Sequence, residues 1–130
     1  MSLESDFIAR LRSFATDDAA RGLMDDTALL GDLVLTHDMI VAGVHFLPED
    51  PPQDVAWKLV AVNLSDLAAK GAVPMGILLG AGLTGDAGWN AGFTDGLRDA
   101  CVHFGVPLLG GDTVKMPAGS VVTLGLTAIR

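Results

Sequence analysis

Residues 54–74 read DVAWKLVAVNLSDLAAKGAVP, and this stretch predicts a largely apolar helix in the middle of the chain. Asp54 is a suitable N-cap residue, because its side chain can accept hydrogen bonds from the free N–H groups of a first helical turn. Gly71 is of the type that commonly follows a helix end, and Pro74 does not continue a helix. We therefore predict a helix over residues 55–70 that ends at Gly71.

The segments around this helix alternate between helical and strand-like patterns. Apolar residues at helical spacing predict further helices over residues 3–15 and 89–104, the second ended by Gly105. Apolar runs predict strands at residues 27–30, 33–41, 75–83, 106–109 and 121–129. Loops are expected at residues 16–22 and 46–53. The order helix, two strands, helix, strand, helix, two strands is typical of an α+β fold. We expect a mixed sheet with helices packed on one face, and a hairpin turn at Gly31-Asp32.

The chain is more apolar than one helix layer explains. Half of its 130 residues are apolar and its mean hydropathy is +0.46, which indicates a sheet buried on both faces. A second subunit is the simplest structure that would bury the other face of the sheet, so we expect a homodimer. The longest uncharged stretch, residues 72–85, contains four glycines and a proline and is too short for a membrane span.

The charge balance limits the kinds of partner. Eight basic residues against sixteen acidic ones give a net charge of -8, which disfavours binding to nucleic acid.

The single cysteine, Cys101, excludes an internal disulfide and suits a reducing compartment, with a buried structural thiol the favoured interpretation. The N-terminus shows no export signal, so we expect a cytoplasmic protein without membrane contact.

Acidic residues stand in two places near the predicted hairpin. Asp25-Asp26 is a pair of adjacent carboxylates that repel each other unless a cation neutralises them, and Mg²⁺ prefers such oxygen ligands. For a single pair of this kind, a solvated acidic loop is the favoured interpretation. Asp38 lies in an apolar strand and shares one face with Thr36, while His37 lies on the other. Asp38 is therefore a candidate metal ligand or an edge-strand residue that faces water.

Two further motifs carry polar residues in apolar surroundings. Residues 63–66, NLSD, place three poor helix formers inside the predicted helix, which indicates a polar site beside it or a helix broken at Ser65 and capped again by Asp66. Residues 110–113, GGDT, follow a predicted strand, where glycines can approach a phosphate and Asp112 can bridge it to Mg²⁺. An ordinary turn is the alternative.

His45, after Gly43, is either a loop histidine or a donor to a substrate phosphate. The sequence contains neither the phosphate-binding GxxxxGK[ST] motif nor a protein-kinase lysine motif. Any ATP binding must therefore use metals held by carboxylates.

Four motifs together resemble those of thiamine-monophosphate kinases, in that family's order and approximate spacing. They are DDTALL (25–30), THDMIVAGVHFLP (36–48), VNLSDLAAKGAVP (62–74) and GGDT (110–113). The resemblance extends over essentially the whole chain. It also places the chain in a superfamily with aminoimidazole ribonucleotide synthetase, selenophosphate synthetase and a hydrogenase-maturation protein.

The resemblance implies an ATP-dependent, Mg²⁺-dependent direct transfer of a phosphoryl group to thiamine monophosphate, which gives thiamine diphosphate. It implies that residues 1–130 form the ATP-binding and dimerisation domain, and that the family's second domain is absent, so that this chain alone is inactive or weak. By motif match, the implied metal positions are Asp26, Thr36, Asp38, Asp66 and Asp112, with Asp25 an adjacent candidate. Gly111 and Asp112 match an ATP contact, and His45 matches a substrate contact.

The chain departs from the family pattern at Met24, where the family has glycine, and at His37, where it has threonine. Two rival hypotheses stay open at this point. One is a superfamily relative that acts on another substrate, such as an aminoimidazole ribonucleotide precursor. The other is a non-catalytic dimerisation or nucleotide-binding module.

Overall fold

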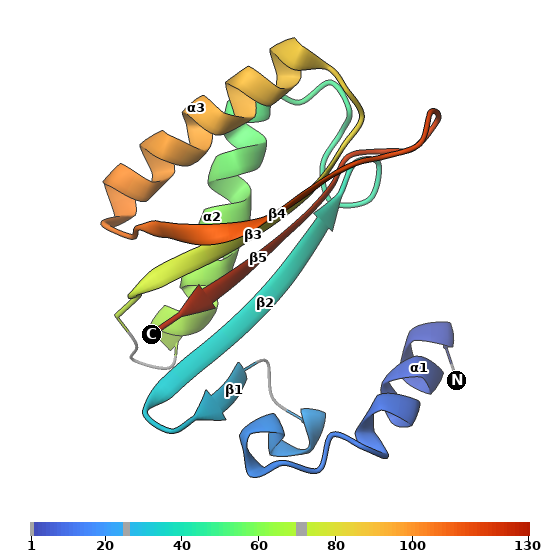
Figure 1. The fold of residues 1–130 in the computed structure, drawn as a ribbon, viewed down its shortest axis with the longest axis vertical. Coiled ribbons are helices and arrows are strands. Elements are labelled where there is room, and N and C mark those ends of the chain that lie inside the picture. The colour runs from blue at the N-terminus through green and yellow to red at the C-terminus, as the bar shows by residue number, and fades with distance from the viewer. Residues whose placement is uncertain (1, 25–26, 70–72) are drawn as a thin grey trace.

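A five-stranded sheet with two long helices on one face forms the body of the computed structural model (Figure 1). The structure describes residues 2–24, 27–69 and 73–130, with the backbone alone at residues 66–69. In chain order the elements are α1 (Leu3–Arg12), the 3-10 helix η1 (Asp18–Leu23), β1 (Thr27–Leu30), β2 (Leu33–Val41), α2 (Pro52–Ala69), β3 (Gly76–Leu83), α3 (Ala87–Phe104), β4 (Leu108–Lys115) and β5 (Thr123–Ile129). The predicted order of helices and strands is confirmed, with η1 added where a loop was expected.

The sheet has the strand order β1-β2-β5-β3-β4. β1 and β2 form the predicted antiparallel hairpin, in which Leu30 pairs with Leu33 across the turn. β5 enters between β2 and β3 and is antiparallel to both, whereas β3 and β4 are parallel. The sheet is therefore mixed, as predicted, and its edges are β1 and β4.

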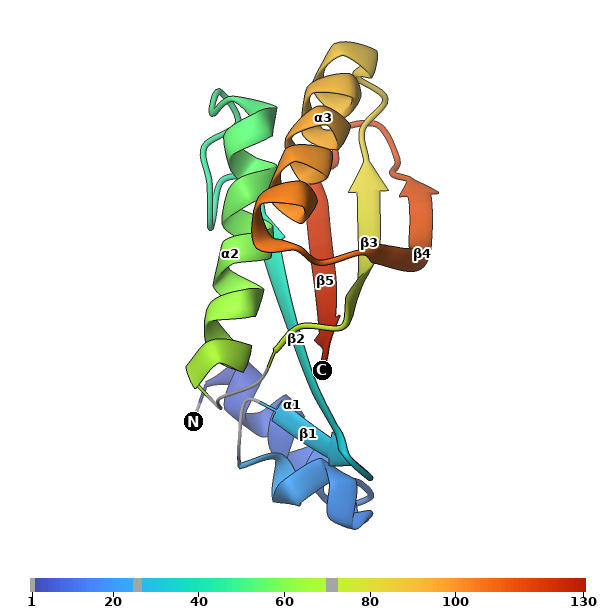
Figure 2. The same cartoon turned by 90° about the vertical axis from the view of Figure 1, so that its left-hand side faces the viewer.

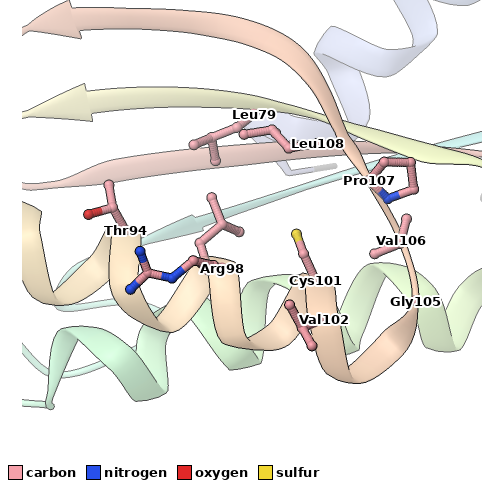
Figure 3. Close-up of a pocket in the computed structure, with 10 residues that line it drawn as sticks. Leu79, Thr94, Arg98, Cys101, Val102, Gly105, Val106, Pro107 and Leu108 are labelled. Carbon is pink, nitrogen blue, oxygen red and sulfur yellow. The ribbon is translucent and has the colours of Figure 1, made fainter.

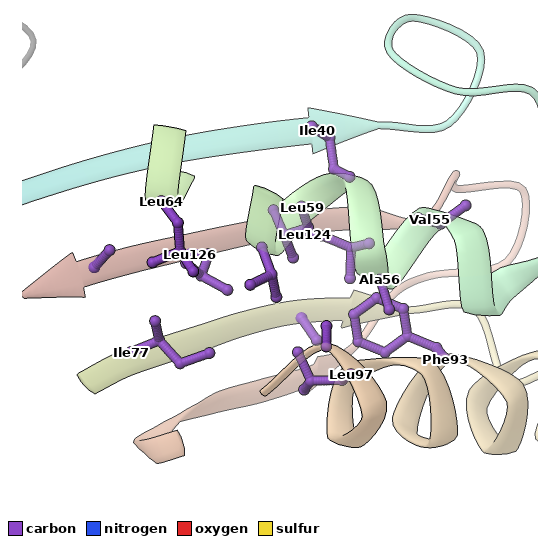
Figure 4. Packing of buried hydrophobic residues seen from close by; sticks show 14 of the residues in the cluster. Ile40, Val55, Ala56, Leu59, Leu64, Ile77, Phe93, Leu97, Leu124 and Leu126 are labelled. Atoms are coloured by element: carbon purple, nitrogen blue, oxygen red, sulfur yellow. The ribbon is translucent and has the colours of Figure 1, made fainter. Parts of the chain in front are cut away.

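The helices α2 and α3 lie side by side over one face of the sheet (Figure 2). Side chains alternate between the faces of a strand, so every second residue of β2, β3 and β5 points to the side of the sheet on which the helices lie. The buried cluster contains, among others, Ile40, Ile77, Leu124 and Leu126 from the strands and Val55, Leu59, Val60, Phe93 and Leu97 from the helices (Figure 4). α1 stands apart from this core and buries none of its residues.

The boundaries of α2 differ from the prediction in an informative way. The helix begins at Pro52, so Asp54 lies in its first turn rather than at its N-cap. Proline is well suited to a first turn, because it has no N–H group that would need an intrahelical partner there. The helix continues unbroken to Ala69, so the alternative of a break at Ser65 is wrong.

β4 is the second difference from the prediction. It covers Leu108–Lys115, so residues 110–113 form the middle of a strand rather than a turn after one. A β-bulge shifts the register, since Ile77 pairs with Leu108 but Leu78 pairs with Gly110. A Cβ atom at Gly111 would collide with the backbone carbonyl of Leu79, so this close approach of the two strands requires glycine.

Candidate functional site

Thr36 and Asp38 lie on the same face of β2, as predicted, and this is the face that α2 covers. They alternate with exposed His37 and Met39 and are in phase with the core residue Ile40. Thr36 is buried, and Asp38 is half-buried. The Oδ2 atom of Asp38 is buried without a hydrogen-bond partner among the residues that the structure describes. A buried carboxylate oxygen is costly without a partner, and a divalent cation is a partner that suits it.

A second buried acceptor lies in α2. Asn63 is fully buried; its Nδ2 atom donates to the carbonyl of Leu59 at 2.9 Å. Its Oδ1 atom has no partner within the described part of the chain. The sequence predicted a polar site beside residues 63–66, and this unpaired acceptor lies within that stretch.

For three of the predicted metal ligands, the structure describes the residue only in part or not at all. Asp25 and Asp26 lie outside the described residues. Asp66 lies in α2, three residues beyond Asn63, where the structure describes the backbone alone.

Asp112 lies on the opposite side of the sheet from Asp38. It pairs with Gly80 in the parallel register, and with His37, Met39 and Val114 it lines a cavity of about 330 Å³ on the face that none of the described helices covers. In the described residues no three histidine, cysteine, aspartate or glutamate side chains come close enough to hold one metal ion. The candidate metal ligands within the described residues are thus divided between the two faces of the sheet.

His37, one of the departures from the family pattern, also belongs to the uncovered face. Its Nδ1 atom lies 2.7 Å from Oγ1 of Thr127, and its ring packs over Gly125. The floor of the cavity is formed by glycines at 80, 82 and 125, which leave room that larger residues would fill.

His45 is held by two contacts in the turn that follows β2. Its Nδ1 atom accepts a hydrogen bond from the backbone N–H of Val41 at 3.0 Å. A ring nitrogen that accepts is unprotonated, so in the neutral ring the proton is on Nε2. The ammonium group of Lys58 donates to the carbonyl of His45. The sequence did not single out Lys58, although a charged residue in an apolar helix is a signal that could have identified it.

An apolar cavity of about 640 Å³ lies elsewhere, between α3 and the strands β3 and β4. Leu79, Val106 and Leu108 line it, and Cys101 directs its sulfur from α3 toward the strands (Figure 3). Burial raises the pKa of the Cys101 thiol, which supports the structural interpretation of this residue. The cavity has no carboxylate in its lining and so does not resemble a metal-phosphate site.

The helices of the described residues include none that is long and apolar enough to cross a membrane.

Comparisons with known proteins agree with this fold. Residues 24–129 match the family described as AIR synthase related protein, N-terminal domain. The chain is 41% identical over 131 residues to the thiamine-monophosphate kinase of Escherichia coli K12, an alignment that covers 96% of this chain and 39% of that protein. It is 45% identical over 129 residues to the thiamine-monophosphate kinase of Caulobacter vibrioides, with 92% of this chain and 37% of that protein covered.

A solved structure, AaThiL complexed with AMPPCP and TMP, superimposes on 99% of the chain with a TM-score of 0.84 and 27% sequence identity. The match covers 43% of that protein. The chain thus spans about two fifths of the length of the relatives that it matches. The resemblance to thiamine-monophosphate kinases is confirmed, and the chain belongs to the AIR synthase related proteins, in which it corresponds to the N-terminal domain.

Proposed function

We propose that this chain is the metal- and nucleotide-binding part of a kinase that transfers the γ-phosphoryl group of ATP to thiamine monophosphate. The observation that carries the proposal is the buried, unpartnered Oδ2 atom of Asp38. It lies in a fold shared with a protein whose structure contains the ATP analogue AMPPCP. The curated relatives named as thiamine-monophosphate kinases support the choice of substrate.

Mg²⁺ is the metal we propose, held by oxygen ligands. The proposed ligands are Asp25, Asp26, Thr36, Asp38, Asp66 and Asp112. When bound, the ion neutralises phosphate charge and so lets two anionic groups approach each other. Because Asp112 lies on the face opposite Asp38, we assign it to a separate Mg²⁺ that accompanies the nucleotide, with Gly111 as a nucleotide contact, rather than to the ion at Asp38.

His45 is the proposed substrate contact. Its Nδ1 atom is engaged by Val41, so the Nε2–H group is free to donate to a phosphate oxygen. Such a donor orients the acceptor phosphate without forming a covalent intermediate. Direct transfer between the two bound substrates is therefore the proposed reaction.

We further propose a cytoplasmic location, and we propose a homodimer. In this dimer the uncovered face of the sheet pairs with a second copy of the chain. Exposed Met39, Leu78 and Val114 lie on this face beside the cavity with the glycine floor. Exposed apolar side chains of this kind favour burial against another sheet. Sedimentation of the chain at several concentrations tests this proposal: a dimer supports it, and a monomer throughout contradicts it.

Calorimetric titration with Mg-ATP tests the proposed binding function. The parent chain is expected to bind, and Asp38→Asn and Asp112→Asn are expected to bind at least about tenfold more weakly, since each loses a charged contact to the metal-nucleotide complex. Asp99→Asn, an exposed position on α3, is the matched control and should bind like the parent. A dimeric parent chain that shows no heat of Mg-ATP binding would instead support a non-catalytic dimerisation module.

A further inference from the structure

Asn63 is an unusual residue for the buried face of a helix. Its neighbours on that face, Leu59, Val60 and Leu64, are apolar and belong to the core. Its amide orientation is fixed by the hydrogen bond from Nδ2 to the carbonyl of Leu59, because the opposite orientation would put two acceptor oxygens together. The Oδ1 atom therefore points away from Leu59 and has no partner among the described residues. An unpaired buried acceptor of this kind is destabilising, because it has lost its hydrogen bonds to water without gaining a partner.

The unpaired oxygen of Asp38 lies at the same level of the molecule as Asn63. α2 runs opposite to β2, and Ile40 of β2 points toward the part of α2 that carries Leu59 (Figure 4). Two residues back along a strand is about 6.6 Å, which leads from Ile40 to Asp38. Four residues on along a helix is about 6 Å in the same direction, which leads from Leu59 to Asn63. Both side chains are on the buried sides of their elements, and these two rises bring them to about the same level of the layer between the sheet and α2.

Two buried acceptor oxygens in this layer need either a hydrogen-bond donor or a cation between them. A water molecule can donate to both, but it leaves the carboxylate charge of Asp38 buried without a counter-charge. A divalent cation satisfies both oxygens and neutralises the charge, and Mg²⁺ and Mn²⁺ accept amide as well as carboxylate oxygens.

We propose that Oδ1 of Asn63 and Oδ2 of Asp38 bind one divalent cation between β2 and α2. Asn63 then is a further ligand of the metal centre, beyond the aspartates and Thr36. This inference rests on the proposed metal-binding function and extends it to a neutral amide ligand. The amide completes the coordination of the ion without adding charge, so more of the ion's positive charge remains for phosphate.

Titration of the chain with Mn²⁺ in the absence of nucleotide, followed by electron paramagnetic resonance, tests the inference. Asn63→Leu keeps the approximate volume but removes the ligand, and it should weaken Mn²⁺ binding about tenfold or more. Asn63→Asp replaces a neutral oxygen by a charged one and should strengthen it. The control is Asn90→Leu at the chain's other asparagine, on α3, which should bind Mn²⁺ like the parent.

Thermal unfolding gives an independent readout. Asn63→Leu removes an unpaired buried acceptor, so without Mn²⁺ its melting temperature should equal or exceed that of the parent. Added Mn²⁺ should raise the melting temperature of the parent and of Asn63→Asp, but not that of Asn63→Leu. A purely structural asparagine gives a lower melting temperature at every Mn²⁺ concentration, which would overturn the inference.

Three results in the Mn²⁺ titration would also overturn it: a parent chain that binds no Mn²⁺, an Asn63→Leu variant that binds within twofold of the parent, or an unchanged affinity in Asn63→Asp. The last comparison remains decisive if Asn63→Leu does not fold. Failure of the Mg-ATP titration with intact, Asn63-dependent Mn²⁺ binding would reject the proposed nucleotide function and leave this metal ligand established.

Discussion

Lys58 of α2 donates a hydrogen bond from its ammonium group to the backbone carbonyl of His45, in the turn that follows β2. The same histidine accepts the N–H of Val41 on its ring. His45 is therefore tied to the helix layer through its main chain and to the sheet through its side chain.

Removal of the Lys58 contact should destabilise this turn. Lys58→Met keeps the apolar stem but removes the donor, and it should lower the free energy of unfolding by about 1 kcal/mol. Urea denaturation measures the change. Lys115→Met, at the exposed end of β4, is the control and should change stability by less than about 0.5 kcal/mol. Equal losses in the two variants would contradict an anchoring role for Lys58.

The hydrogen bond from Val41 also predicts the tautomer of His45. In the neutral ring the proton should be on Nε2, because Nδ1 is occupied as an acceptor. Long-range ¹H–¹⁵N correlation spectra at alkaline pH distinguish the two nitrogens. A ring protonated at Nδ1 would show that the turn is not held in this way and would remove Nε2 as a donor to phosphate.

The helix layer depends on glycine at one position of α3. A Cβ atom at Gly96 would lie 2.6 Å from Cα of Gln53 and 2.7 Å from its carbonyl oxygen, so the backbones of α2 and α3 would have to separate. Gly96→Ala should therefore cost about 1–3 kcal/mol of unfolding free energy.

Gly88→Ala is the matched control for this substitution. A Cβ atom there has an ordinary contact of 3.5 Å with Oδ1 of Asp86, and alanine favours a helix more than glycine does. Gly88→Ala should leave stability unchanged or raise it by up to about 1 kcal/mol. Chemical denaturation of the two variants, side by side, checks both expectations, and a neutral Gly96→Ala would show that the helices can move apart at little cost.

The Cys101 thiol should react slowly in the folded chain. Burial raises its pKa, so less thiolate is present near pH 8 than in the unfolded chain. Folding stability is therefore unaffected by this thiol below its ordinary pKa, and it falls as the pH rises above that pKa. Reaction with a chromogenic disulfide reagent, with and without urea, measures the difference, and equal rates in both conditions would contradict it.

Local patterns in the sequence predicted most of the elements correctly. The helical spacing of residues 89–104 and the turn at Gly31-Asp32 are local signals, and both are confirmed. The position of β5 between β2 and β3 depends on pairing between distant segments, so no local pattern contains it. The glycines of β4 resemble a turn by composition, but the close approach of Leu79 places them inside a strand.

The candidate site was predicted in part, for a similar reason. The alternation of side chains correctly placed Thr36 and Asp38 together and His37 on the other face. It could not place Asp112 relative to Asp38, because that relationship depends on the register of β4 and on its β-bulge. The residue type at position 58 also did not indicate that Lys58 reaches the turn at His45, since that contact joins residues 13 positions apart.

The outer position of β4 has a practical consequence for work on the isolated chain. Each of its residues is exposed, and the backbone on its outer side faces no other strand of the sheet. A free edge of this kind accepts strands from other molecules, and growth does not stop at two copies when β4 pairs with the β1 edge of the next molecule. Concentrated samples should therefore form aggregates that obscure any closed dimer.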